Sequence, residues 1–288
     1  MQLRAVQARA QGKLKRALAR APLLESWADR RYDRALAQHA PRLQDLGCVW
    51  AELVATMKRD MVATLDGATL IPADVLHEAR WLCQELARDD SAHSTIVCSP
   101  SALARAPSVY AWGLADTNLD LAESYIELPV RYLGVSFKRE RADAASFDTR
   151  QWHLDVEDRR MLKLIVYLDA VDEESGPFEY LDRATTLMMS TKLDYTSGFV
   201  DDARLERVVA RDAWRTVLGP PLTTVVVDTC RLMHRARPPR VRDRYSMSFS
   251  YCSARPTQLF PEYLPPRAFV ASLASQLSAR QRSAAAHA

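Results

Sequence analysis

The sequence predicts a mainly β fold with added helices: an antiparallel sandwich or barrel, with a helical region before it and a helix after it. Segments rich in β-branched and aromatic residues predict the strands, at residues 130–140, 162–171, 222–229 and 244–253. Their spacing is wide and irregular, and the chain has no strand–helix alternation and no G-x-G-x-x-G loop, which argues against a doubly wound sheet. We therefore divide the chain into a helical region, a β core and a C-terminal helix with its tail, at residues 1–95, 96–258 and 259–288.

Apolar residues recur every three or four positions over residues 24–90, which predicts a series of helices. Pro41 interrupts the pattern, and Pro72 suits the first turn of the helix that follows it. Two further helices are predicted, one at 117–128 and a last one at 267–288 that ends in an alanine-rich tail.

Residues 1–24 contain six basic and no acidic residues, with apolar residues at helical spacing opposite the basic ones. This pattern predicts a basic amphipathic helix. We expect it to pack on the surface of its own domain. Contact with anionic lipid and a role as an organelle presequence are the alternatives.

Composition excludes several classes of protein. The chain is 48% hydrophobic and 26% charged, and it has no apolar run near the length of a membrane span, so we expect a soluble protein without a transmembrane segment. The net charge of +3, from interspersed basic and acidic residues, does not indicate a nucleic-acid partner. Five widely spaced cysteines without a CxxC pair predict neither a disulfide framework nor a zinc ribbon, and we expect a reducing cytoplasm.

The segment QWHLD at 151–155 places an imidazole and a carboxylate two residues apart. On a strand, residues i and i+2 project to the same side, so His153 and Asp155 can face one point inside a barrel. His234, just after the strand predicted at 222–229, is the candidate for a third ligand. Two imidazoles and one carboxylate leave three adjacent positions open on an octahedral metal, which is the arrangement of non-haem Fe(II) oxygenases.

Arg244 follows ten residues after His234 and shares one side of a predicted strand with Ser246 and Ser248. A planar guanidinium can bind a carboxylate through two hydrogen bonds, and a nearby hydroxyl can add another. Arg244 and Ser246 are therefore candidates to bind the distal carboxylate of 2-oxoglutarate. A salt-bridged surface position is the alternative for Arg244, because other arginines crowd the same segment.

Lys163 lies in an otherwise apolar run, where an unpaired ammonium would be costly. It could contact the cosubstrate, pair with an acidic residue, or face outward on a twisted strand. Tyr167 shares its face and is either a second hydrogen-bond donor to the cosubstrate or a core tyrosine whose hydroxyl is satisfied within the protein. Lys138, on the strand predicted at 130–140, has less support.

The chain resembles the phytanoyl-CoA dioxygenase family of Fe(II)/2-oxoglutarate-dependent oxygenases over roughly residues 100 to 255, best at 150–182 and 228–251. In that family an H-x-D pair opens the motif, a Gly-Pro turn follows, and a distal His and then an Arg close the site. This chain has the same order, with QWHLD, the Gly176-Pro177 turn, and His234 and Arg244 in HRARPPRVRDRYSMSFSY.

The resemblance implies a double-stranded β-helix, or jelly roll, with helices packed outside it. It implies Fe(II) held by His153, Asp155 and His234, 2-oxoglutarate bound by Arg244, and dioxygen as the oxidant. The implied reaction is hydroxylation of an unactivated C–H bond with release of succinate and CO2. Asp155 argues against a halogenase, because related halogenases replace this carboxylate with a small residue.

Two departures from the family pattern stand out. Ala236 occupies a position where a small hydroxyl residue often follows the distal histidine, so that hydrogen bond to the cosubstrate is lost. The stretch EYLDRATTL replaces the usual Pro-Gly-Ser-His sequence after the Gly-Pro turn. The helices at 24–90 and the loop at 183–220 are where we expect substrate specificity.

The substrate is predicted only as a small molecule, anionic or linked to CoA or a carrier; the basic cluster at 231–244 would suit an anion, and solvated arginines would explain it equally well. Two alternatives to the oxygenase remain: a non-catalytic jelly-roll binding protein, and a cupin-like metalloenzyme that does not use 2-oxoglutarate. His77-Glu78 does not form a zinc helix, because Trp81 stands where H-E-x-x-H needs histidine. The sequence does not determine the oligomeric state.

Overall fold

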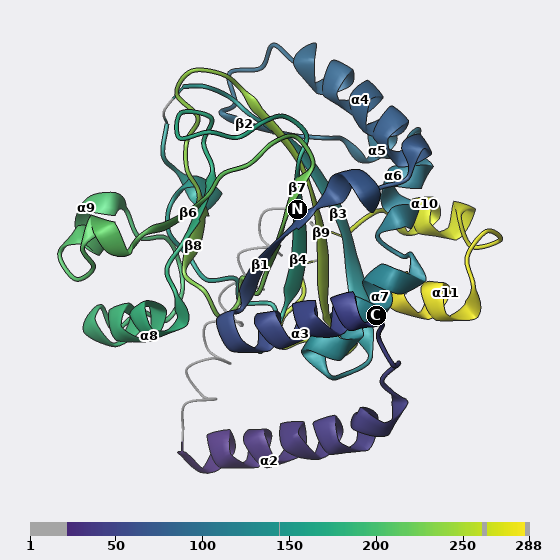
Figure 1. Ribbon diagram of the computed structural model, residues 1–288, viewed down its shortest axis with the longest axis vertical. Coiled ribbons are helices and arrows are strands. Elements are labelled where there is room, and N and C mark those ends of the chain that lie inside the picture. The colour runs from purple at the N-terminus through teal and green to yellow at the C-terminus, as the bar shows by residue number, and fades with distance from the viewer. Residues whose placement is uncertain (1–21, 144, 261–263, 286–288) are drawn as a thin grey trace.

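Two antiparallel β-sheets with surrounding helices form the protein, in a computed structural model that describes residues 22–143, 145–260 and 264–285 (Figure 1). The strands are β1 (Val62–Asp66), β2 (Thr95–Val97), β3 (Val130–Glu140), β4 (Leu162–Tyr167), β5 (Phe178–Tyr180), β6 (Arg215–Val217), β7 (Thr223–Val227), β8 (His234–Ala236) and β9 (Arg244–Ser253). The helices are α2 (Pro22–His39), α3 (Cys48–Asp60), α4 (Ala73–Ala87), α5 (Pro100–Leu103), α6 (Pro107–Trp112), α7 (Asp116–Ile126), α8 (Arg183–Lys192), α9 (Asp202–Glu206), α10 (Arg267–Ser272) and α11 (Ala279–Ala285). Single 3-10 turns lie at Ala40–Arg42, Gly67–Thr69, Asp148–Arg150 and Arg211–Ala213.

The larger sheet has the strand order β1-β7-β4-β9-β3-β2, and the smaller sheet has the order β6-β5-β8, with every pair antiparallel. Strands β3, β4, β7 and β9 confirm the four predicted strand segments, and α7 confirms the helix predicted at 117–128. In Figure 1 the smaller sheet, α8 and α9 lie on one side of the larger sheet, and α4, α6, α10 and α11 lie on the other.

The two faces of the larger sheet have different chemistry. On β4 the residues that face the helices are apolar and belong to the main hydrophobic core, namely Leu162, Leu164 and Val166. The alternate residues of the same strand line a cavity on the side of the smaller sheet, namely Lys163, Ile165 and Tyr167. Because side chains alternate along a strand, one buried strand contributes to both the core and the cavity.

A β-bulge in β3 decides which of its residues reach the cavity. The register with β9 shifts between Tyr132 and Gly134, and Gly134 has a φ of 107°, in the region that favours glycine. Before the bulge Tyr132 packs in the helix-side core, and after it the odd-numbered Phe137 does. The bulge therefore inverts the alternation, and the even-numbered residues that line the cavity are Ser136, Lys138 and Glu140.

A second hydrophobic cluster joins the two sheets, with Tyr167 and Val225 from the larger sheet packed with Phe178 and Val217 from the smaller one. A third cluster lies under α8 and α9 and contains Trp152, which is fully buried. The segment at 183–220, which we predicted as a loop, forms α8, α9 and β6. It supplies much of this third cluster.

The helical prediction is wrong at residues 62–66, which form β1 on the edge of the larger sheet beside β7. Met61 ends α3 in a left-handed conformation, with a φ of 64°, and its N–H still donates to the carbonyl of Met57. The β-branched Val62 and Thr64 then suit an extended strand. The apolar spacing of this segment fits both states, and pairing with β7 selects the strand.

The single C-terminal helix predicted at 267–288 is also wrong, because the chain forms α10 and α11 with a turn between them. Ser278 and Gln281 make a reciprocal capping box: the Gln281 N–H donates to the Ser278 hydroxyl at 3.2 Å, and the Ser278 N–H donates to the Gln281 side chain at 2.9 Å. This cap starts a new helix. Residues 286–288 lie outside the described part of the chain.

The basic helix predicted at 1–24 lies outside the described residues up to residue 21, and α2 begins at Pro22. Among the residues described, no helix combines the length and the hydropathy that crossing a bilayer requires. All five cysteines are free thiols.

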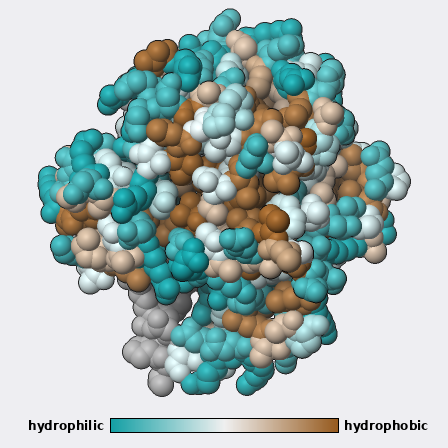
Figure 2. Space-filling view, in the orientation of Figure 1, coloured by the Kyte–Doolittle hydropathy of each residue, from teal (hydrophilic) through white to brown (hydrophobic). Residues whose placement is uncertain are grey.

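Figure 2 shows apolar side chains gathered near the centre of the face on which α3, β1 and α7 lie. A cavity of about 270 Å³ opens there, lined by Trp50, Leu65, Trp112, Leu121 and Leu164 among others. It lies on the helix side of the larger sheet, because Leu164 belongs to the helix-side core.

Asp228 is a fully buried carboxylate at the end of β7. It accepts hydrogen bonds from the Tyr125 hydroxyl at 2.7 Å and from the Cys230 N–H at 3.0 Å. Burial raises the pKa of Asp228 from 3.8 to about 7. Since the folded state holds this proton more tightly than the unfolded state, its stabilising effect is complete below pH 3.8 and is lost as the pH rises through about 7.

We expect Asp228→Asn to remove this pH dependence, because a carboxamide resembles the protonated acid in shape and in hydrogen bonding. Between about pH 4 and 7 the free energy of unfolding of the wild type should fall by ~1.4 kcal/mol per pH unit relative to the variant. Urea denaturation of both proteins across this range measures the difference. A difference in the free energy of unfolding that stays constant with pH would contradict a raised pKa for Asp228.

Candidate functional site

His153 and His234 lie side by side because their backbones form an antiparallel bridge. The N–H of His153 donates to the carbonyl of His234 at 2.9 Å, and the N–H of His234 donates back at 3.0 Å. The two ring centroids are 4.3 Å apart. Residues 153–155 are not on a regular strand as predicted; they form an extended segment that this bridge and a second one, between Trp152 and Val200, hold in place.

Asp155 completes a cluster with the two histidines. Its N–H donates to the carbonyl of Thr229 at 3.0 Å, and its Oδ1 lies 3.6 Å from Nε2 of His153. One ligand atom from each of the three residues lies within 4.8 Å of the others. Within the described residues, this is the one group of three or more histidine, cysteine or acidic side chains arranged closely enough to hold a metal ion. The structure thus brings together the three residues selected from the sequence.

Hydrogen bonds fix the tautomer of both histidines. Nδ1 of His153 lies 2.8 Å from the carbonyl of Gln151, and Nδ1 of His234 lies 3.0 Å from the carbonyl of Leu232. A carbonyl only accepts, so each Nδ1 must donate, and each Nε2 keeps a lone pair. Burial lowers the pKa of His153, and burial together with His153 lowers the pKa of His234 to about 3. Both rings are therefore neutral, as metal binding requires.

Lys163 pairs with Asp155, its Nζ 2.5 Å from Oδ2, so it adopts the acidic-partner alternative of the sequence analysis. Although burial opposes ionisation, the Lys163 ammonium holds the pKa of Asp155 below its usual range. The ammonium occupies one carboxylate oxygen and leaves Oδ1 on the side of His153. Such a carboxylate is suited to bind a metal through one oxygen.

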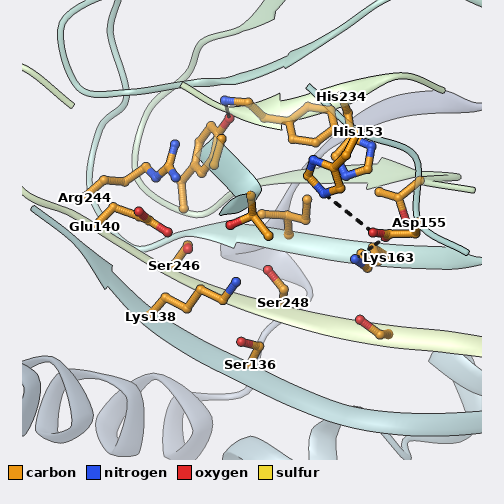
Figure 3. Close-up of a pocket in the computed structure, with 17 residues that line it drawn as sticks. Ser136, Lys138, Glu140, His153, Asp155, Lys163, His234, Arg244, Ser246 and Ser248 are labelled. Carbon is orange, nitrogen blue, oxygen red and sulfur yellow. Dashed lines mark hydrogen bonds and ion pairs between the residues drawn. The ribbon is translucent and has the colours of Figure 1, made fainter. Parts of the chain in front are cut away.

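Arg244 lies at the other end of the same cavity, which has a volume of about 130 Å³ (Figure 3). Arg244 is only 5% exposed, and its Nε has no hydrogen-bond partner. It makes no ion pair with any residue that the structure describes, although burial of an unpaired cation is costly. Ser246, two residues along β9, is buried beside it and lines the cavity. This arrangement suits a ligand carboxylate.

Tyr167 also lines the cavity, but its hydroxyl has partners within the protein. It donates to the carbonyl of Val217 at 3.1 Å and accepts from the N–H of Phe178 at 3.0 Å. Its hydroxyl proton is therefore used in a hydrogen bond between the two sheets. Of the two interpretations considered for Tyr167, the geometry fits the core tyrosine with a satisfied hydroxyl.

Further polar side chains line the floor of the cavity, and the sequence did not predict them as ligands. Besides the predicted residues, the polar side chains that line it are Ser136, Lys138, Glu140, Thr149, Thr229, Ser248 and Ser250. A signal was present, since serine, lysine and glutamate alternate with other residues in SFKRE, and serines alternate in SMSFS. The bulge in β3 hid which of the two alternating sets faces inward.

The basic segment at 231–244 is mostly neutralised by acidic residues. Arg235 lies 2.6 Å from Glu179, and Arg237 pairs with Glu179 at 3.0 Å and with Glu173 at 2.8 Å. Arg242 lies 2.8 Å from Asp172. These arginines hold the loops around the smaller sheet, so the cluster gives no support for an anionic substrate at the cavity mouth.

The fold is similar to that of several solved protein structures. No model of a protein family matches the sequence, and no curated protein does. The likeness to known proteins lies in the fold.

Three solved structures illustrate the likeness. EctD from S. alaskensis, with 2-oxoglutarate and 5-hydroxyectoine, has a TM-score of 0.51 at 19% identity, over 75% of this chain and 83% of its own. SnoN, a non-haem alpha-ketoglutarate-dependent epimerase from nogalamycin biosynthesis, has a TM-score of 0.51 at 16% identity, over 76% and 91%. HygX from Streptomyces hygroscopicus, with nickel and 2-oxoglutarate bound, has a TM-score of 0.50 at 17% identity, over 73% and 88%. At these identities the comparison establishes the fold.

The cluster predicts a divalent-metal site that depends on each of its three side chains. We expect His153→Ala, Asp155→Ala and His234→Ala each to weaken binding of Ni(II) or anaerobic Fe(II) by roughly 100-fold or more, since a three-ligand site loses a ligand. Isothermal titration calorimetry measures the affinity. His77→Ala, at an exposed position on α4, is the matched control and should bind as the wild type does. Unchanged binding in the three cluster variants would place the metal elsewhere.

Proposed function

We propose that this protein is a non-haem Fe(II)/2-oxoglutarate-dependent oxygenase that hydroxylates a small molecule at an unactivated C–H bond. One observation supports this above the others: a His153–Asp155–His234 cluster and a buried arginine without an ion-pair partner among the described residues share one cavity. The similar structures support it further, since EctD and HygX were solved with 2-oxoglutarate and SnoN is an alpha-ketoglutarate-dependent epimerase.

In this proposal the two sheets form a double-stranded β-helix, with the cavity between them. The cluster that joins the sheets through Tyr167 and Phe178 closes one part of the cavity, and His153 and His234 come from the smaller-sheet side. Lys163 and Arg244 come from the larger sheet. The site is thus assembled across the gap between two rigid sheets, which suits precise placement of a ligand.

Each residue has a separate role. His153, Asp155 and His234 would hold Fe(II), and Lys163 orients the Asp155 carboxylate through its hydrogen bond. Bound iron and 2-oxoglutarate supply the oxidising chemistry, in which one atom of dioxygen enters succinate, the other enters the product, and CO2 is released. Arg244 binds the distal carboxylate of 2-oxoglutarate.

Ser246 lies directly opposite Tyr167 on β4, beside the proposed position of the distal carboxylate, and its hydroxyl is placed to add a hydrogen bond to it. The apolar Ile165 and Phe178 line the same cavity and limit the access of water. Ala236 also lines the cavity and offers no hydroxyl, in keeping with the hydrogen bond that the sequence predicts to be absent. We place the protein in a reducing compartment such as the cytoplasm, which suits its five free thiols.

The binding-protein alternative gives no reason to place three metal-ligating side chains and an unpaired buried arginine in one cavity, at the cost of burying them. A metalloenzyme that does not use 2-oxoglutarate accounts for the cluster but not for Arg244. The role of Arg244 therefore separates that alternative from our proposal.

Protein purified without oxygen and supplied with Fe(II), 2-oxoglutarate and air should release succinate, since uncoupled turnover needs no substrate. We expect Arg244→Ala to raise the KM for 2-oxoglutarate by roughly 10- to 100-fold, because it removes a charge-assisted pair of hydrogen bonds. Arg242→Ala, in the same segment but half exposed, is the control and should not change it.

Metal affinity, measured by calorimetry, should be the same in the wild type and in Arg244→Ala. Full activity of Arg244→Ala would favour a metalloenzyme that does not use 2-oxoglutarate. A wild type that binds neither metal nor 2-oxoglutarate would favour the binding protein.

A further inference from the structure

We propose that the substrate carries a carboxylate and that Lys138 binds it inside the cavity. This inference rests on the function proposed above, because that function assigns 2-oxoglutarate to Arg244. Lys138 would then determine specificity, and the anionic character of the substrate would be recognised deep in the site.

Lys138 reaches the cavity from the centre of its floor. Its partner across the β3–β9 ladder is Ser246, and Arg244 lies two residues before Ser246 on β9. Figure 3 shows the Lys138 side chain between Arg244 at one end and the His153–Asp155–His234 cluster at the other. A ligand bound near the metal would therefore lie within the reach of a lysine side chain.

The Lys138 ammonium makes no hydrogen bond or ion pair with any residue that the structure describes. Glu140, on the same face of β3, forms its hydrogen bonds elsewhere: its Oε2 accepts from Nε of Arg150 at 2.8 Å and from the Thr95 hydroxyl at 2.8 Å. Its charge attracts Lys138 without a hydrogen bond between the two side chains. An ammonium drawn away from water without a partner is costly, and an anionic ligand would offset that cost.

The other cations near the site are already committed. Lys163 binds Asp155, and the arginines at 235, 237 and 242 bind acidic residues around the smaller sheet. Arg244 is assigned to the cosubstrate. Within the described part of the cavity lining, Lys138 is the cation that remains for the substrate.

Hydroxyl groups beside Lys138 complete a carboxylate site. Ser136 on β3 and Ser248 on β9 are direct cross-strand partners. They lie two residues along the strands from the pair Lys138 and Ser246, on the same face of the sheet. Both line the cavity. A carboxylate held by the ammonium can accept further hydrogen bonds from these hydroxyls, since its two oxygens offer about four acceptor positions.

The test uses trifluoroacetate as the probe, on the full-length protein loaded with Mn(II) and saturating 2-oxoglutarate. Paramagnetic Mn(II) accelerates the ¹⁹F relaxation of probe molecules that bind beside it, and it avoids turnover. We expect enhancement with the wild type, a roughly tenfold smaller effect with Lys138→Met, and near wild-type behaviour with Lys138→Arg. Lys192→Met, at an exposed position on α8, is the matched control and should retain the effect. Neutral trifluoroethanol should show no enhancement with any variant.

Equal enhancement in the wild type and Lys138→Met would overturn the proposal. So would a loss of 2-oxoglutarate affinity in Lys138→Met as large as that in Arg244→Ala, because Lys138 would then belong to the cosubstrate. Failure of the wild type to bind Mn(II) or 2-oxoglutarate by calorimetry is a different result and refutes the proposed function. In that case the ¹⁹F line width of the probe with metal-free protein decides the anion site: a Lys138-dependent broadening supports it, and none refutes it.

Discussion

The backbone bridge between His153 and His234 is the interaction on which the site depends. Two hydrogen bonds join a segment before β4 to the start of β8, 81 residues later in the chain, and set the two imidazoles side by side. Nδ1 of each ring is bound to a carbonyl two residues earlier in its own segment. The backbone therefore places the rings, and the local carbonyls orient them.

What holds this bridge is apolar burial on its far side. Trp152 is fully buried in the cluster under α8 and α9, and its indole N–H donates to Asp202 at 3.1 Å. Arg235, the residue after His234, lies over the Trp152 ring at 4.8 Å and pairs with Glu179. The geometry of the His153–Asp155–His234 cluster thus depends on the segment at 183–220, which supplies none of its three side chains.

Charge pairing separates structural ions from ions that are available to ligands. Arg150 is fully buried and bound to Glu140, and Lys163 is bound to Asp155, so these ions are compensated within the protein. Arg244 and Lys138 face the cavity, and neither has an ion-pair partner among the residues that the structure describes. Because burying a charge without a close partner lowers stability, these two positions are where we propose that a ligand supplies the partner.

Much of the fold could be predicted from the sequence, because its signals are local. Segments rich in β-branched and aromatic residues mark β3, β4 and β9, and helical periodicity marks α4 and α7. Residues 62–66 were missed because their apolar spacing fits a helix as well as a strand, and only β7 distinguishes the two. The C-terminal region was missed because a capping box within an alanine-rich run is a weak signal.

The sequence by itself determined which side chains are candidates for the site: an H-x-D pair, a later histidine and an arginine, in the order found in the family that the chain resembles. The tertiary structure decided which side chains are already paired. In the folded chain Lys163 pairs with Asp155, and the Tyr167 hydroxyl donates to the carbonyl of Val217. Most arginines of the basic segment pair with acidic residues, and Lys138 faces the cavity. The order of the motif residues can be read from the sequence, whereas ion pairing depends on distances across the sheets. The bulge in β3 and the contact between the two sheets set these distances, and both exist only in the folded chain.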